Sequence, residues 1–391
     1  MKKIRLFWVI TVILLITSIG VPGSCQPQDT FSTKPVTNQG KKWHIAYYEG
    51  GEYIDYQKIF TEILHGLMQL GWIEVIDIPA QNGEQTSDLW GWLNRNMKSD
   101  YIEFVKDAHY SAKWDETLRK EVVGSLMKRL VDRKDIDLLI AMGTWAGKDF
   151  ANNKHSTPTM VVSASDPITA GIIKSVEDSG FDHVHAQVDP FRYERQIRIF
   201  HEVINFKRLG VAYENTVNGK SYAAIDSIEK VAKEKGFEIV RCFTKSDVAD
   251  TAEADASVVQ CFKELVSKSD AIYVTVQGGV NTKSIPNLVK IANDKKIPTF
   301  SQSGSEEVKY GFLLSLSQAG FKYIGLFHAE TFAKVFNGAK PNQIGQSFKE
   351  PPKLAINLMT AEIIGFNPPM VILGASDEIF RTITPLKKMT D

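Results

Sequence analysis

Cysteine is rare in this chain, which has three cysteines in 391 residues. With 43% hydrophobic residues, the chain is long enough for about two to three domains with full-sized cores. Cys242 and Cys261 lie in the body of the chain. They either pair with each other or serve as buried small apolar residues, and the sequence leaves both alternatives open.

An excess of charge of one sign is also missing, since Lys and Arg total 46 and Asp and Glu total 46. This balance excludes the basic footprint of nucleic-acid-binding proteins and a polybasic membrane-binding surface. The chain also lacks a Gly-x-Ser-x-Gly elbow, a phosphate-binding Gly-x-x-x-x-Gly-Lys loop and a His-Glu-x-x-His motif. We therefore expect no catalytic residues and no cofactor.

Metal-ligand spacing is absent as well. His183 and His185 alternate along one predicted strand, but no nearby Cys or acidic pair completes a metal site. We interpret this segment as an exposed strand and expect no bound metal.

The N-terminus departs from the average composition. Lys2, Lys3 and Arg5 precede an apolar run at 6–16, which has the layout of a secretory signal and is too short for a stable membrane anchor. Cys25 follows, and the arrangement resembles a bacterial lipoprotein signal in which Cys25 becomes lipidated. The alternative is ordinary cleavage nearby. We expect a signal peptide at 1–24 and a linker at 25–42.

Two short apolar runs, 138–142 and 159–162, each stop abruptly in small polar residues. Such runs are typical of buried parallel strands, and open α/β sheets bind ligands just beyond the carboxyl ends of their strands. The pattern predicts that these two strand ends form one wall of a small-molecule cleft.

The remaining elements of the first half follow the same alternation. A strand at 43–48 precedes a helix from Ile54 that Gly71 closes, and the second strand is either 73–78 or 101–105. We interpret 79–100 as an insertion whose helix, 88–96, uses Trp90 and Trp92 for a small core of its own. A long helix at 114–133 and a strand at 183–188 complete this half.

A second series starts at Arg208 with the same order and similar length. It predicts strands at 209–213, 237–243, 271–276, 298–300 and 311–316, and helices at 220–235, 251–267, 285–293, 321–336 and 354–364. The repeated alternation predicts an α/β protein with two similar Rossmann-like lobes, each a parallel sheet with helices on both faces. We expect an N-terminal lobe at 43–187 with 317–345 crossing back, and a C-terminal lobe at 188–316 with 346–391.

The predicted strand ends carry hydroxyl, amide and aromatic side chains but few fixed charges, which favours capture of a small polar molecule between the lobes. The aromatic residues either stack on the ligand or pack under loops. Asp166 either accepts a hydrogen bond from a ligand ammonium or caps the next helix. The candidate ligand-binding residues are Tyr48, Glu49, Tyr53, Thr144, Trp145, Ser163, Ser165, Asp166, Asn215, Thr275, Gln277, Ser301, Gln302 and Ser303.

Three segments carry a resemblance to a known family: 165–171 (SDPITAG), 206–213 (FKRLGVAY) and 356–361 (INLMTA), the last followed by Pro368-Pro369. With these motifs the chain resembles the ABC transporter substrate-binding proteins, relatives of the type I periplasmic binding proteins. The first strand end, Tyr48-Glu49-Gly50-Gly51, and the 79–100 insertion depart from the family pattern.

The resemblance implies a type I periplasmic-binding-protein fold, with a multi-strand hinge of about three crossovers and closure on a small ligand that is delivered to a membrane permease. Some members of the family bind aromatic amino acids. We expect an exported, lipid-anchored, monomeric solute-binding protein of the periplasm or cell surface, and not an enzyme. The alternative is a ligand-sensing receptor of the same fold that reports to a membrane kinase or chemoreceptor.

Overall fold

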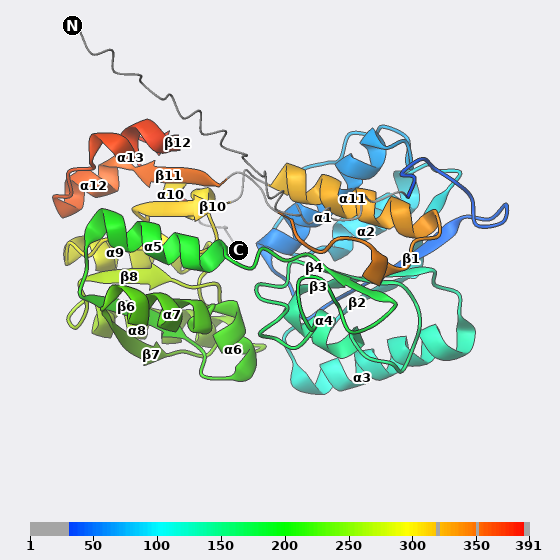
Figure 1. Cartoon of the computed structure of the whole chain (residues 1–391), viewed down its shortest axis with the longest axis horizontal. Helices are drawn as coiled ribbons and strands as arrows, with labels where there is room; N and C mark the ends of the chain where they lie inside the picture. Colours follow the sequence, from blue (N-terminus) through cyan, green and yellow to red (C-terminus); the bar gives the residue numbers. More distant parts are fainter. Residues whose placement is uncertain (1–30, 318–320, 349–351, 387–391) are drawn as a thin grey trace, which may run out of the picture. The chain divides into compact units, whose positions relative to one another are not determined.

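The computed structural model describes residues 31–317, 321–348 and 352–386, which form one unit built on two sheets (Figure 1). The expected signal peptide and Cys25 lie outside the described residues. In the described ranges, no helix is both long and apolar enough to cross a membrane.

The first sheet has five parallel strands in the order β2-β1-β3-β4-β5. The predicted pair 138–142 and 159–162 is confirmed, because these runs form adjacent, fully buried strands. The second strand is the later of the two candidates, and 73–78 is not a strand; Val75 there is 85% exposed. The strands are β1 (Trp43–Glu49), β2 (Ile102–Ser111), β3 (Leu138–Met142), β4 (Thr159–Val162) and β5 (Val184–Ala186).

Helices cover both faces of this sheet. Alternate residues of β1 point to opposite faces, and both sets are buried. Ile45 and Tyr47 join the core under α1 (Ile54–Gln69), α2 (Ser87–Asn96) and α11 (Phe321–Phe336). Ala46 and Tyr48 join the core under α3 (Glu116–Lys128), its π-helical extension η1 (Arg129–Arg133) and α4 (Gly143–Phe150). Although α11 comes late in the chain, it packs along α1 (Figure 1).

The second sheet repeats this plan. Its first five strands have the order β7-β6-β8-β9-β10, which is the order of the first sheet, and all are parallel. Two later strands extend it: β11 runs antiparallel to β10, and β12 pairs with β11. The strands are β6 (Arg208–Tyr213), β7 (Glu238–Phe243), β8 (Ala271–Val274), β9 (Thr299–Ser301), β10 (Leu314–Ser317), β11 (Lys353–Asn357) and β12 (Ser376–Phe380).

The second sheet also has a hydrophobic core on each face. One core lies under α5 (Arg192–Ile204), α7 (Ile225–Lys235) and α12 (Leu358–Ile364). The other lies under α8 (Thr251–Leu265) and α9 (Ile285–Asp294). The short helices α6 (Val217–Tyr222), α10 (Ser305–Lys309) and α13 (Met370–Ala375) complete the described helices of this lobe. The architecture confirms the predicted fold of two similar Rossmann-like lobes.

Two predicted helices differ from the structure. The helix expected at 220–235 is broken into α6 and α7, because Ala224 adopts a left-handed conformation with φ of 51°. The helix expected at 354–364 begins as strand β11, whose apolar residues pair with β10, and only its second half is helical. Asn357 ends the strand and caps α12 by accepting a hydrogen bond from the Thr360 backbone N–H at 3.0 Å.

Two interpretations of side-chain environment were wrong. Trp90 does not form a separate small core. It is 2% exposed and packs against Tyr47, Phe60 and Phe104 in the main core of the first lobe. The segment with His183 and His185 is not exposed, since His185 is fully buried and its Nε2 lies 3.2 Å from the Gly345 carbonyl oxygen of the returning chain.

The chain passes between the sheets after β5, returns after β10 and passes again after α11. Two of these crossover segments pair with each other. Val188 and Ser347 form a parallel bridge, flanked by hydrogen bonds from Val188 N to Gln346 O at 2.9 Å and from Phe348 N to Val188 O at 3.0 Å. The lobes are therefore joined by extended segments held side by side.

Candidate ligand-binding site

A cavity of about 500 Å³ lies between the carboxyl ends of the two sheets, and residues of both lobes line it. The first lobe contributes the β1–α1 and β3–α4 connections and the end of β4. The second contributes the start of α5, the end of α6 and the loops after β7, β8 and β9. This volume suits a small molecule. The strand order reverses between β1 and β3 in the first sheet and between β6 and β8 in the second, and open α/β sheets bind ligands at such a reversal.

Glycines let aromatic rings approach the backbone at the first-lobe wall. Gly143 has φ of 86°, and a Cβ atom there would lie 1.9 Å from the Tyr56 hydroxyl oxygen. A Cβ on Gly51 would lie 2.4 Å from the Trp114 ring. Any other residue at either position would displace an aromatic ring that lines the cavity.

Trp145, near the start of α4, is held from several sides. The Arg119 guanidinium stacks over its ring at 4.1 Å, and the Trp114 ring meets it edge-on at 5.4 Å between centroids. Arg119 also makes two hydrogen bonds of 2.9 Å to the Asp149 carboxylate, which accepts a third from the Tyr48 hydroxyl at 2.8 Å. Tyr48 therefore supports the wall from behind.

Asp247, in the loop after β7, meets this wall from the second lobe. Its Oδ2 accepts hydrogen bonds from Trp145 Nε1 at 2.7 Å and from the Tyr222 hydroxyl at 2.5 Å. Burial raises the pKa of Asp247 to about 6, although these two hydrogen bonds act in the opposite direction. The carboxylate thus joins both lobes at the cavity.

Charged groups gather elsewhere in the cavity. Burial raises the pKa of Asp55 to about 6, although the positive charges of Lys58 and Arg192 act to lower it. Burial likewise raises the pKa of Glu307 to about 7, and Glu307 accepts a hydrogen bond from the Ser301 hydroxyl at 2.6 Å. Lys58 forms an ion pair with Glu306 of α10. The expectation of a rim with few fixed charges was therefore wrong.

Arg192 is the first residue of α5 and lines the cavity. Its Nε is buried and has no hydrogen-bond partner among the described residues. Burying a donor without a partner is costly, and the N-terminus of a helix favours negative charge. The arrangement therefore suits a carboxylate of a ligand.

The structure brings part of the predicted residue set to the cavity. Seven candidates line it: Tyr53, Thr144, Trp145, Ser163, Ser165, Gln277 and Ser303. The other seven are not among its lining residues: Tyr48, Glu49, Asp166, Asn215, Thr275, Ser301 and Gln302.

The residues outside the lining have other partners. Glu49 is buried and accepts hydrogen bonds from the hydroxyls of Tyr47 and Thr86 at 2.7 and 2.9 Å. Asp166 accepts a hydrogen bond from the Thr169 backbone N–H at 2.9 Å, but residues 167–171 form a turn, so the expected helix for Asp166 to cap is not there. Gln302 donates to the Tyr222 carbonyl oxygen at 2.7 Å and accepts from the Val276 backbone N–H.

The remaining outside positions are structural or peripheral. The Thr275 hydroxyl donates to the Ala212 carbonyl oxygen at 2.6 Å, and Ser301 bonds Glu307 as described above. Asn215 is exposed.

Sequence reasoning missed Asp55, Arg192, Tyr222 and Asp247, all of which line the cavity. Asp55 could have been found, because it opens the helix that follows β1, beside the point where the strand order reverses. Asp247 gave no such signal, since it follows edge strand β7. No group of three or more His, Cys, Asp or Glu able to hold a metal ion occurs in the part of the chain that the structure describes.

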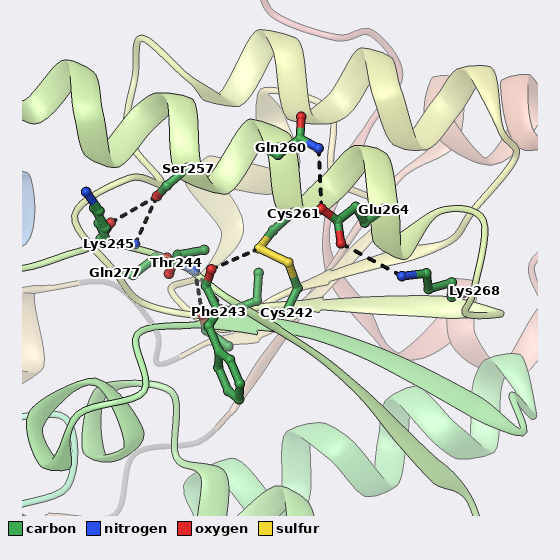
Figure 2. The surroundings of a disulfide bond; sticks show 12 residues. Cys242, Phe243, Thr244, Lys245, Ser257, Gln260, Cys261, Glu264, Lys268 and Gln277 are labelled. Carbon is green, nitrogen blue, oxygen red and sulfur yellow. Dashed lines mark hydrogen bonds and ion pairs between the residues drawn. A yellow bond between two sulfur atoms is a disulfide. The ribbon is translucent and has the colours of Figure 1, made fainter.

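The two alternatives for Cys242 and Cys261 are resolved, because these residues form a disulfide with Cα atoms 5.6 Å apart (Figure 2). The bond joins β7 to α8 and so closes the loop that carries Asp247. Thr244, in the same loop, donates to the Gln277 side-chain oxygen at 2.6 Å, and the Lys245 backbone N–H donates to Ser257 at 3.0 Å (Figure 2).

Comparison with solved structures shows the same fold. A conserved domain protein from Vibrio cholerae aligns with a TM-score of 0.66 at 19% identity, over 87% of this chain and 100% of that one. The ABC domain in complex with L-Trp from Streptococcus pneumonia aligns with a TM-score of 0.62 at 20% identity, over 87% of this chain and 100% of that one.

Sequence comparison identifies the family. A tyrosine-binding protein from Clostridioides difficile is 27% identical over 234 residues, which are 59% of this chain and 63% of that protein. The match thus spans less than two thirds of the relative. The family described as ABC transporter substrate binding protein matches residues 96–379. The chain belongs to this family of solute-binding proteins, which are not enzymes.

Proposed function

We propose that this protein captures an aromatic amino acid between its two lobes by hinge closure and delivers it to the membrane permease of an ABC transporter. The observation that carries this proposal is a cavity that combines the guanidinium of Arg192, whose buried Nε has no hydrogen-bond partner among the described residues, with the carboxylate of Asp55 inside aromatic walls.

The charges suit an amino acid as a zwitterion. Its carboxylate would bind Arg192 and the N-terminus of α5, and its ammonium would bind Asp55. Hydrogen bonds between charged groups are roughly twice as strong as those between neutral groups. The carboxylate and the ammonium of an amino acid are attached to the same carbon atom, so they lie close together. A binding pair made of one cation and one anion at neighbouring positions matches that geometry.

The aromatic walls support an aromatic side chain. Tyr53, Tyr56, Trp114, Trp145 and Tyr222 all line the cavity. Rings of this kind pack on a flat ligand in offset or edge-to-face arrangements. The relatives agree with this chemistry, since one is named for binding tyrosine and another was solved with L-Trp.

Contacts across the cavity support closure. Trp145 bonds Asp247, Lys148 Nζ donates to Asn218 Oδ1 at 2.8 Å, and Lys58 pairs with Glu306. Each contact joins a first-lobe element to a second-lobe element, so it forms only when the lobes come together. A ligand that touches both lobes would favour the same state, and binding would shift the population toward it.

We further propose that the mature protein is a monomer held outside the cytoplasm by a lipid on Cys25. Substrate-binding proteins of ABC importers work outside the cytoplasm, which agrees with the basic and apolar N-terminal pattern. A lipid on Cys25 would keep the protein near its permease.

The proposal is tested by adding each of the common amino acids to the purified mature protein and measuring its melting temperature. Tyrosine or tryptophan should raise it by mass action on the folded state, and calorimetry should give a single site. Absence of a shift with every amino acid would contradict the proposal.

The role of Arg192 is tested with Arg192→Gln, which should weaken binding of the amino acid by about 100-fold because a charged partner of the carboxylate is lost. L-tyrosinamide lacks the carboxylate and should bind the normal protein and Arg192→Gln equally weakly. Arg195→Gln is the matched control, because Arg195 lies on the same helix, pairs with Asp189 and does not line the cavity.

A further inference from the structure

The two oxygen atoms of Asp247 have unequal surroundings. Oδ2 already accepts two short hydrogen bonds, from Trp145 and Tyr222. For Oδ1 the neighbour is the Ser246 hydroxyl at 3.5 Å, which is at the outer limit of a hydrogen bond. A carboxylate oxygen accepts about two hydrogen bonds, so Oδ1 retains acceptor capacity on a residue that lines the cavity.

Asp247 and the charged pair have different neighbours. Asp247 accepts hydrogen bonds from Trp145 and Tyr222, whereas the positive charge of Arg192 acts on Asp55. Burial and the charges of Glu49, Asp247 and Asp55 raise the pKa of Tyr56. The carboxylate and ammonium of an amino acid are attached to one carbon atom. A ligand whose carboxylate binds Arg192 can therefore place its ammonium at Asp55, which leaves Asp247 for the side chain.

The groups around Asp247 are those that would enclose a ring. Three aromatic residues near Asp247 line the cavity: Trp145, Tyr222 and Tyr56. Trp145 and Tyr222 donate hydrogen bonds to Asp247, and the charge of Asp247 acts on Tyr56. A ligand ring packed among them would present its polar edge to Oδ1.

Building on the proposed function, we propose that Asp247 determines specificity by accepting a hydrogen bond from a polar hydrogen on the ligand's aromatic ring. A phenol O–H or an indole N–H supplies such a hydrogen, and the phenyl ring of phenylalanine does not. The site therefore selects tyrosine or tryptophan against phenylalanine. An analogue that leaves a buried acceptor unpaired binds much more weakly. This discrimination is far stronger than the discrimination of an apolar pocket against a small change in ligand size.

The test compares dissociation constants for tyrosine, tryptophan and phenylalanine, measured by calorimetry. In the unmodified protein, phenylalanine should bind about 100-fold more weakly than the tighter of the other two. The comparison of tyrosine with tryptophan identifies which donor the site fits. Equal binding of phenylalanine would overturn this inference while leaving the proposed function intact. Failure of all three to bind would overturn both.

The variant Asp247→Leu replaces the carboxylate by an apolar group of similar shape. The preference over phenylalanine should fall below about 3-fold, mainly because tyrosine or tryptophan binds less well. If Asp247 only joins the lobes, or binds the ammonium, the substitution weakens the binding of all three amino acids by one common factor. The preference over phenylalanine then stays unchanged, and this result would overturn the proposal. Asp250→Asn is the matched control. Asp250 is an exposed acid of the same loop that caps α8, and Asn also caps helices, so the preference should remain that of the unmodified protein.

Discussion

The indole nitrogen of Trp145 in the first lobe donates a hydrogen bond to Asp247 in the second lobe across 2.7 Å. These residues are 102 positions apart in the sequence, and both line the cavity. The bond therefore couples the position of the lobes to the geometry of the site.

Trp145→Phe keeps a ring at the cavity wall but removes the donor. On the proposed closure, affinity for every ligand should fall by about tenfold, because a hydrogen bond to a carboxylate is lost only from the closed state. Calorimetry measures the loss. Trp43→Phe is the control, since its indole donates to the Val36 carbonyl oxygen away from the cavity. Equal losses in both variants would argue against the coupling.

Ligand affinity should depend on pH through Asp55. Its pKa is raised to about 6 in the ligand-free protein, and an ammonium binds only the ionised form. The dissociation constant should therefore rise as pH falls through 6, by about tenfold at pH 5. Titrations between pH 5 and 8 measure this dependence. Asp55→Asn should bind weakly with a flatter profile, and an unchanged slope in that variant would assign the effect to another group.

Glu49 should make the folded protein less stable at high pH. Burial raises its pKa to about 7, so between pH 4.5 and 7 the folded state binds more protons at this site than the unfolded chain does. Its contribution to stability is present below pH 4.5 and is lost as pH rises through 7, by up to about 3 kcal/mol.

Glu49→Gln removes this titration while retaining an oxygen for the Tyr47 and Thr86 hydroxyls. Urea unfolding at pH 5 and pH 8 should show the unmodified protein losing stability relative to the variant as pH rises. Parallel changes in the two proteins would show that Glu49 does not titrate in this range.

The disulfide should stabilise the second lobe and the loop that carries Asp247. The cysteines are 19 positions apart, so replacing both by Ala should lower the free energy of unfolding by about 3 kcal/mol. Ligand affinity should also fall, because the loop loses one of its attachments. Urea unfolding and calorimetry measure the two effects. A reductant should reproduce them in the unmodified protein and have no further effect on the double variant.

Local sequence patterns were enough to predict the sheets and their repetition. Runs 138–142 and 159–162 are apolar at every position except Thr159, which is typical of strands buried on both faces. The polar residues after these runs placed one wall of the cavity. Thr144, Trp145 and Ser165 were found in this way, because they follow the strand ends directly.

Tertiary contacts determine which side chains meet across the cavity, and these could not be predicted from local patterns. Segment 354–364 is apolar enough for strand or helix, and pairing with β10 selected the strand for its first half. Trp90 entered the main core because Tyr47, Phe60 and Phe104 provide its contacts. Asp55 and Arg192 became neighbours, and Asp247 reached Trp145, through contacts between residues far apart in the chain. Local patterns predict elements because propensity and burial act over a few residues, whereas the electrostatics of this site arise from side chains that only the fold brings together.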